Sequence, residues 1–415
     1  MKKESIRIAL AYVGVIVGAG LSSGQDLLQY FLSFGMPGIL GAIGLGLLNI
    51  LFGRIIVTLG CYYQANSHQE VLGEITTPLV NKIVDGTLVL SNFVMGFVML
   101  AGAGANLQQQ FGIPSWIGSL FCALLIIAVS FMNFERITGV LGIFTPIIIL
   151  MIFMVTVYSL TQGSYDWNVL DQAARTIQPV IPSLWLAVIN YFSLCLLTGV
   201  SMAFVLGGSI VRIGVAEKGG TYGGMMIGFV VVCASLALFA NIDVAKEAEI
   251  PMLVIVGQIH PFLSVLYACV IFALIFNTAF SLFYATSRRF SGTNTKWMRI
   301  WMIFIVTAGY ICSFGGFRNL VSSMYPTLGY MGSLLLLILL VSWLKNHHKI
   351  IEEKLLRRKM IGLRLKKQDE NRVFTDKDQK LFEQLSEQSV ADTETLKRDV
   401  KEYADHMIKK EKISG

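Results

Sequence analysis

The chain has 415 residues, of which 54% are hydrophobic and only 14% are charged, and its formal net charge is +7. Soluble domains carry about 25% charged residues, so this composition excludes an ordinary soluble globular protein. The charges are also uneven, because 18 of the 33 Lys and Arg and 14 of the 26 Asp and Glu lie from Lys345 onward. We therefore expect a membrane region followed by a polar tail.

Apolar stretches of roughly 18 residues or more recur before the tail, and this length crosses a hydrocarbon core of about 30 Å. They predict an all-α membrane protein of about ten transmembrane helices. The predicted spans are 6–31, 36–62, 83–108, 114–132, 137–160, 183–211, 219–240, 261–287, 297–314 and 317–344. The expected domains are a transmembrane domain, 1–345, and a cytoplasmic tail, 346–415.

Basic residues in the short connections predict the orientation. One alternate set of connections holds eleven basic residues, whereas the opposite set holds Arg175, Lys246 and Arg318. Cytoplasmic loops carry the excess of Lys and Arg. The sequence therefore predicts a multi-pass protein of the cell membrane with both termini in the cytoplasm.

The first span contains three glycines within seven residues, Gly18, Gly20 and Gly24, with Ser22 and Ser23 between them. These residues weaken a helix in the middle of the membrane, where an unwound backbone is tolerated only if it lines a cavity. The interruption predicts a binding site. Carbonyls before it would suit a cation, and amide N–H groups after it would suit a carboxylate.

Asp26 follows this interruption, and two roles are open to it. Ser22 with Gln25 and Ser23 with Asp26 have the spacing of a capping box, which would make Asp26 a stabiliser of the outer half-helix. An acid within a span is also a candidate proton or cation site. The two roles are compatible.

The same segment has the Gly-x-Ser-x-Gly spacing of a hydrolase nucleophile elbow at Gly20, Ser22 and Gly24. That elbow needs a strand-to-helix turn and a histidine base, whereas this serine interrupts an apolar helix. The sequence also lacks a phosphate-binding loop and a Cys/His metal cluster. We predict no enzyme activity, no cofactor and no nucleic-acid partner.

The sixth span offers a second polar, small-residue stretch at Ser193, Thr198, Gly199 and Ser201. Two interruptions five spans apart predict two inverted five-helix repeats, over about 6–160 and 183–344. The alternative is a close helix interface built from small residues.

Polar and small residues also occur in the third and eighth spans. Met99 and Gly102 are expected to form a wall opposite the first span. Thr278 and Ser281 could complete an oxygen shell for a sodium ion together with Asn277. The alternative is that these hydroxyls bond back to their own helix.

The tail begins with a basic amphipathic stretch, 345–367, which would lie close to anionic lipid headgroups. Thr375 and Asp378 then predict a capped helix with Leu381, Phe382 and Leu385 on one face, and a second helix is expected over 393–412. The tail is either a hairpin that binds a cytoplasmic partner or a solvated extension.

The segments GAGLSSGQDLLQYF, MLAGAGANLQQQFGIP and NYF resemble the YkvI-type membrane proteins, which are grouped with the amino-acid permeases of the amino acid–polyamine–organocation superfamily. The resemblance covers roughly residues 5–345. It implies a LeuT-type fold, with two inverted five-helix repeats and a site between the broken first and sixth helices.

We therefore expect a secondary active transporter that carries a small amino acid or related compound by alternating access, coupled to sodium or protons. Residues predicted to bind this substrate are Gly18, Gly20, Ser22, Ser23, Gly24, Met99, Gly102, Phe192, Ser193 and Gly199. Residues predicted to couple the ion are Asp26, Thr278 and Ser281. The alternatives are a membrane ligand sensor that signals through the tail and, third, a passive channel.

Overall fold

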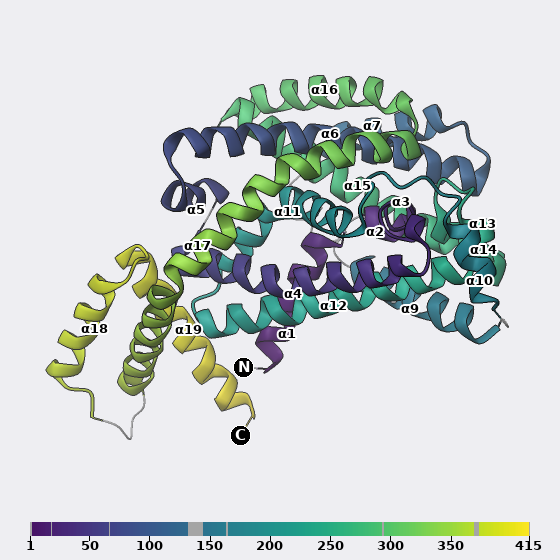
Figure 1. Cartoon of the computed structure of the whole chain (residues 1–415). Helices are drawn as coiled ribbons and strands as arrows, with labels where there is room; N and C mark the ends of the chain where they lie inside the picture. Colours follow the sequence, from purple (N-terminus) through teal and green to yellow (C-terminus); the bar gives the residue numbers. More distant parts are fainter. Residues whose placement is uncertain are drawn as a thin grey trace.

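The computed structural model describes residues 2–17, 19–65, 67–131, 144–162, 165–292, 294–368 and 373–414, and its regular elements there are all helical. Long helices lie beside one another and two short helices, α2 and α3, lie between them (Figure 1). The elements are α1 (Lys2–Ile16), α2 (Ala19–Ser23), α3 (Gln25–Tyr30), η1 (Leu32–Phe34), α4 (Pro37–Tyr63), α5 (His68–Ile75), α6 (Pro78–Phe111), α7 (Ser115–Val129), α9 (Phe144–Gln162), α10 (Trp167–Ala174), α11 (Leu184–Gly208), α12 (Ile213–Ala240), α13 (Ile242–Ala245), α14 (Pro251–Ile259), α15 (Pro261–Ser291), α16 (Thr295–Cys312), η2 (Ser313–Gly315), α17 (Phe317–Gln368), α18 (Asp376–Gln388) and α19 (Thr393–Ser414).

Eight of the described helices are long and apolar enough to cross a membrane, namely α4, α6, α9, α11, α12, α15, α16 and α17. Helix α7 is a shorter apolar helix in the fourth predicted span. The first predicted span is divided among α1, α2 and α3. The start of the fifth predicted span, 137–143, lies outside the described residues. The chain is thus a multi-pass helical membrane protein, and the two inverted repeats stay a prediction.

Glycines bring α4 and α12 into close contact. A Cβ added at Gly46 would lie 2.9 Å from the Cα of Gly228, and one added at Gly220 would lie 2.2 Å from the carbonyl oxygen of Gly53. Because the hydrophobic effect does not hold helices together inside lipid, close backbone packing of this kind is a main source of their attraction.

The predicted interruption of the sixth span is wrong, because α11 is one continuous helix. Thr198 Oγ1 donates to the carbonyl of Cys195 at 3.0 Å, so its hydroxyl is satisfied within the helix. Gly199 makes room for the first helix, since a Cβ there would lie 2.5 Å from Ile16 Cδ1. Gly199 therefore serves a helix interface, which was the alternative interpretation.

The last membrane helix does not end at residue 344. Helix α17 continues to Gln368, and one face of its basic part is buried against the protein, including Arg357 at 1% exposure. The predicted capping box of Thr375 and Asp378 is present at the start of α18, although Leu381 is 43% exposed. The tail helices pack together and also contact Val211.

Both termini lie at the same end of the molecule (Figure 1). Tyr403 in α19 donates to Glu4 Oε2 in α1 at 3.3 Å, and Arg212 Nη1 donates to the same tyrosine hydroxyl at 3.2 Å. The tail is thus attached to α1 and to the connection between α11 and α12.

Candidate functional site

The first span is interrupted where the glycines predict it. Helix α1 ends at Ile16, and Gly24 separates α2 from α3 with a φ of +82°, in the left-handed region that glycine adopts without strain. Ser23 Oγ donates to the carbonyl of Gly20 at 2.8 Å and accepts from the N–H of Gln25 at 3.2 Å. The interruption is confirmed on both sides of Gly18, which itself lies outside the described residues.

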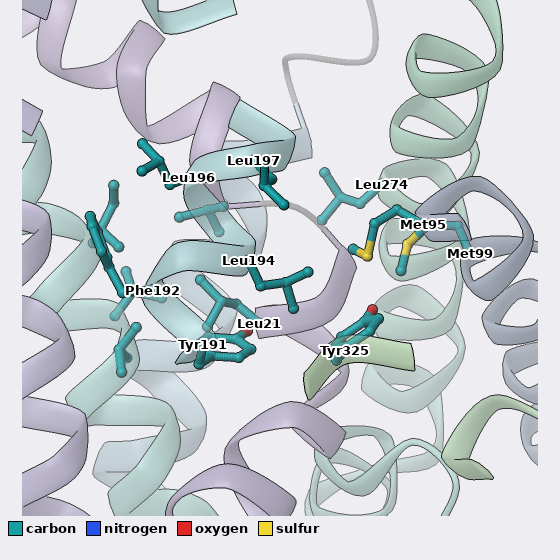
Figure 2. Close-up of a cluster of buried hydrophobic side chains, with 14 of the residues drawn as sticks. Leu21, Met95, Met99, Tyr191, Phe192, Leu194, Leu196, Leu197, Leu274 and Tyr325 are labelled. Atoms are coloured by element: carbon teal, nitrogen blue, oxygen red, sulfur yellow. The ribbon is translucent and has the colours of Figure 1, made fainter. Parts of the chain in front are cut away.

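A cavity of about 520 Å³ lies against this interruption. It is lined by residues of α1, α2, α3, α6, α9, α11, α15 and α17. Met95 and Met99 lie across it from Leu194, and the ring of Tyr325 lies between these two sides (Figure 2). Its volume falls within the range of pockets for small organic ligands, which are mostly apolar with a few polar groups.

Asp26 is the acid of this cavity. Its side chain is 2% exposed, and Oδ2 accepts from the hydroxyl of Tyr191 at 2.8 Å. A Cβ added at Gly20 would lie 2.4 Å from that oxygen, so the glycine leaves room for the carboxylate. Oδ1 has no hydrogen-bond partner among the described residues. The capping box predicted for Ser23 and Asp26 does not form, because Ser23 Oγ bonds the N–H of Gln25 instead.

Two further polar atoms of cavity residues are buried without a partner in the described part of the chain. They are Asn277 Oδ1 on α15 and the hydroxyl of Tyr325 on α17. Buried polar groups are hydrogen-bonded in the great majority of cases, so each unsatisfied atom calls for an explanation. Both residues line the cavity, so a ligand that binds there is a candidate partner for these atoms.

The structure brings five of the predicted site residues to the cavity. They are Gly20, Asp26, Met99, Thr278 and Ser281. Their roles in binding and coupling stay predictions, but they come from four separate helices and converge on one space.

The predicted residues of α11 face other helices. Phe192 packs against Phe52 with ring centroids 5.1 Å apart, and it points away from Met95 in Figure 2. The backbone of Ser193 meets Gly332, where an added Cβ would lie 2.4 Å from the serine carbonyl oxygen. Gly199 faces Ile16 as described above.

Four other predicted residues are also absent from the described cavity wall, namely Ser22, Ser23 and Gly24 near the interruption and Gly102 on α6. The carbonyl of Ser22 accepts from the hydroxyl of Tyr267 at 2.8 Å. A Cβ at Gly24 would lie 2.9 Å from Met252 Cγ, and one at Gly102 would lie 3.1 Å from the ring of Phe317. Ser23 serves the backbone of the interruption.

Sequence reasoning missed the face of α11 that lines the cavity. Tyr191, Leu194, Cys195, Thr198 and Met202 line it. Their spacing of three or four residues is one stripe of an uninterrupted helix. If the span is treated as one continuous helix, counting three or four residues at a time from Tyr191 identifies this stripe.

The cavity extends unequally along the first span. From Gly20 it continues along α1 to Leu10, which is 48% exposed. On the side of α3, Tyr30 and Phe31 are fully buried and form an aromatic cluster with Tyr191. The space is therefore bounded by packed rings toward α3 and reaches surface residues toward the N-terminus.

The interrupted helix and the cavity against it occur within a LeuT-type fold. The solved structure of MhsT in complex with L-phenylalanine matches this chain with a TM-score of 0.57 at 14% identity, over 95% of this chain and 96% of that one. The inward-facing conformation of Mhp1 matches with a TM-score of 0.50 at 14% identity, over 79% and 75% of the two chains. Both are LeuT-fold transporters, and these likenesses establish the fold.

The chain is similar in sequence to the membrane protein YkvI of Bacillus subtilis, which confirms the resemblance to YkvI-type proteins. The two are 27% identical over 334 residues, which are 80% of this chain and 93% of YkvI. The protein YyaD of the same organism is 22% identical over 342 residues, 82% of this chain and 97% of YyaD. Both relatives are described as uncharacterized. No protein-family model matches the chain.

Proposed function

We propose that this protein is a secondary active transporter that carries a small amino acid or a related compound across the cell membrane by alternating access. The observation that carries the proposal is the cavity of about 520 Å³ against an interrupted helix in a LeuT-type fold. In transporters, such interruptions expose backbone groups to a substrate near the middle of the membrane. Leu10 of α1 lines the cavity at one end, and packed rings lie toward α3 at the other.

Ten spans in two inverted repeats, with both termini in the cytoplasm, complete the proposed arrangement. The uptake would be driven by a sodium or proton gradient. Thr278 and Ser281 are the proposed sodium ligands, and Asp26 is the proposed proton site. The sequence has no ATP-binding loop that would supply another source of energy.

Uptake by the purified protein in liposomes tests the proposal. A panel of radiolabelled amino acids and amines is offered under an inward sodium gradient, an inward proton gradient and no gradient. We expect gradient-dependent accumulation of at least one compound, with loss of accumulation after the gradient is collapsed. Absence of uptake for the whole panel, with protein that is folded and inserted, would refute secondary transport.

A ligand sensor is the second candidate, because the tail is attached to the membrane helices. Gln64 Nε2, just beyond α4, donates to Asp399 Oδ2 in α19 at 3.1 Å. Truncation after Gln368 removes α18 and α19 but retains the contacts that Arg357 makes in α17. A transporter keeps its flux after this truncation, whereas a sensor keeps ligand binding and loses its output.

A further inference from the structure

The charge of the cavity identifies the chemical class of its ligand. Asp26 is the only acidic residue among its described lining residues, and these include no Lys, Arg or His. One oxygen of this carboxylate is unpartnered, and the side chain is 2% exposed. A buried carboxylate without a nearby cation is unfavourable, so the space beside it favours a positive group.

The other unsatisfied atoms have the same preference. Asn277 Oδ1 is a hydrogen-bond acceptor, and the Tyr325 hydroxyl can accept as well as donate. An ammonium group has three N–H donors and no acceptor. The rings of Tyr191 and Tyr325 also line the cavity, and aromatic faces attract such cations.

A carboxylate does not fit the place that the sequence offered it. The N–H of Gln25 is occupied by Ser23 Oγ, and the space at Gly24 is filled by Met252. The carboxylate of Asp26 lies against Gly20, where a second negative charge would be repelled. The Gln25 amide is therefore already bonded, and the charge of Asp26 disfavours an acidic group beside Gly20.

The size and lining of the cavity distinguish an organic cation from a metal ion. A sodium ion needs only a small shell of oxygen atoms, whereas this space measures about 520 Å³ and is lined by Met95, Met99, Leu274 and other apolar side chains. We propose that the cavity binds an organic ammonium ion with an apolar body, with its nitrogen at Asp26 Oδ1. This inference rests on the proposed transport function and specifies its substrate class.

Three probes with the same phenylethyl body test this inference. Phenethylamine carries only an ammonium group, L-phenylalanine carries an ammonium and a carboxylate, and 3-phenylpropanoate carries only a carboxylate. Binding to the purified full chain is measured by competition against radiolabelled phenethylamine. We expect phenethylamine to bind about tenfold more tightly than L-phenylalanine, and 3-phenylpropanoate not to compete.

Substitution at the acid provides the second arm. Asp26→Asn is expected to weaken phenethylamine binding by about 100-fold, because the charge partner is lost while the shape is kept. Asp243→Asn, at an exposed position in α13, is the matched control and should bind as the native chain does. The comparison of the three probes uses only the native chain, so the inference can still be tested if Asp26→Asn does not fold.

The results separate this inference from the proposed function. Tighter binding of L-phenylalanine or 3-phenylpropanoate than of phenethylamine would overturn the ammonium assignment while leaving transport intact. Unchanged phenethylamine binding in Asp26→Asn would also overturn it. So would thermal stabilisation of the protein by sodium that depends on Asp26, if no amine binds. Loss of uptake for every compound in liposomes is the separate result that refutes transport.

Discussion

Asp26 and Glu353 are the two buried carboxylates among the described residues, and their surroundings differ. Glu353 Oε1 accepts from Arg357 Nε at 2.7 Å and also from Ser389 Oγ. Arg357 in turn donates to the carbonyls of Cys61 and Tyr62, both at 2.8 Å. Asp26 has Tyr191 as its partner and no cation beside it in the described cavity wall.

This difference separates a structural charge from one that is available to a ligand. The carbonyls that Arg357 binds lie in the last turn of α4, the end of a helix that carries partial negative charge. The pair of Glu353 and Arg357 therefore joins α17 to the end of α4. Asp26 instead keeps one oxygen unpartnered beside a cavity, which a fully satisfied structural group would not do.

The largest effect is expected at the structural pair. Arg357→Ala leaves Glu353 buried without its cation, and breaking such a pair costs about 3 to 5 kcal/mol. We expect a lower thermal unfolding temperature and faster hydrogen exchange in α18 and α19. The double variant Glu353→Leu with Arg357→Met removes both charges and should recover most of that loss. Equal destabilisation by the single and the double variant would show that the loss does not come from the unpaired charge of Glu353.

The opposite sign is expected at Asp26. Asp26→Asn removes a buried charge that has no cation, so the ligand-free protein should become more stable by about 1 to 3 kcal/mol while amine binding is lost. Thermal unfolding of the purified protein with and without phenethylamine measures both changes. A clear loss of stability without ligand would instead place Asp26 among the structural charges.

A smaller effect is expected at the glycine that makes room for the acid. Gly20→Ala places a Cβ 2.4 Å from the present position of Asp26 Oδ2, so the carboxylate must shift. We expect amine affinity to fall about tenfold, equivalent to about 1.4 kcal/mol. Gly86→Ala in α6 is the control, because that Cβ meets nothing within 4 Å and Gly86 is not among the residues that line the cavity. Similar losses in both variants would show that the effect is not specific to the carboxylate.

The smallest effect is expected at the cap of α18. Thr375→Ala removes the side-chain acceptor of the capping box and should cost about 1 kcal/mol, seen as faster amide exchange in α18. Substrate uptake should not change. Reduced uptake in this variant would mean that the tail acts on the cavity.

The same cap sets the pH dependence of this helix. The bond from Lys366 and those from Thr375 lower the pKa of Asp378 from 3.8 to about 2. Because the folded-state pKa is lowered, the stabilisation is present above pH 4 and is lost as the pH falls toward 2. Amide exchange in α18, corrected for its intrinsic rate, should therefore be constant from pH 7 to about pH 5. An increase within that range would contradict this assignment.

Sequence patterns predicted the features that depend on local chemistry. The glycines of the first span, the long apolar helices and the cap at Thr375 could all be predicted, because each depends on residues within a few positions of one another. The same reasoning failed for α11, where Thr198 and Gly199 suggested an interruption. Whether such residues open a helix or pack it against Ile16 depends on a neighbour distant in sequence.

The candidate site could be predicted only in part for the same reason. The glycine- and serine-rich segment that contains Gly20 and Asp26 indicates both residues. Tyr325 lies about 300 residues away in sequence, and only the tertiary structure brings it to the cavity. The role of Arg357 was also hidden, because its partners are the carbonyls of α4. The basic stretch predicted to lie close to lipid headgroups also has one face buried against the protein, and its contact with lipid stays a prediction.

Cys195 offers the most direct test of the central claim, that the cavity beside Asp26 is the substrate site. Its side chain lines the cavity, whereas Cys312 is exposed at the end of α16 and is not among the lining residues. We would measure alkylation of both thiols by N-ethylmaleimide, using mass spectrometry, with and without phenethylamine. Our account predicts slower labelling of Cys195 in the native chain, no such protection in Asp26→Asn, and no change at Cys312. Labelling of Cys195 that is insensitive to phenethylamine, under conditions where the amine is bound, would contradict it.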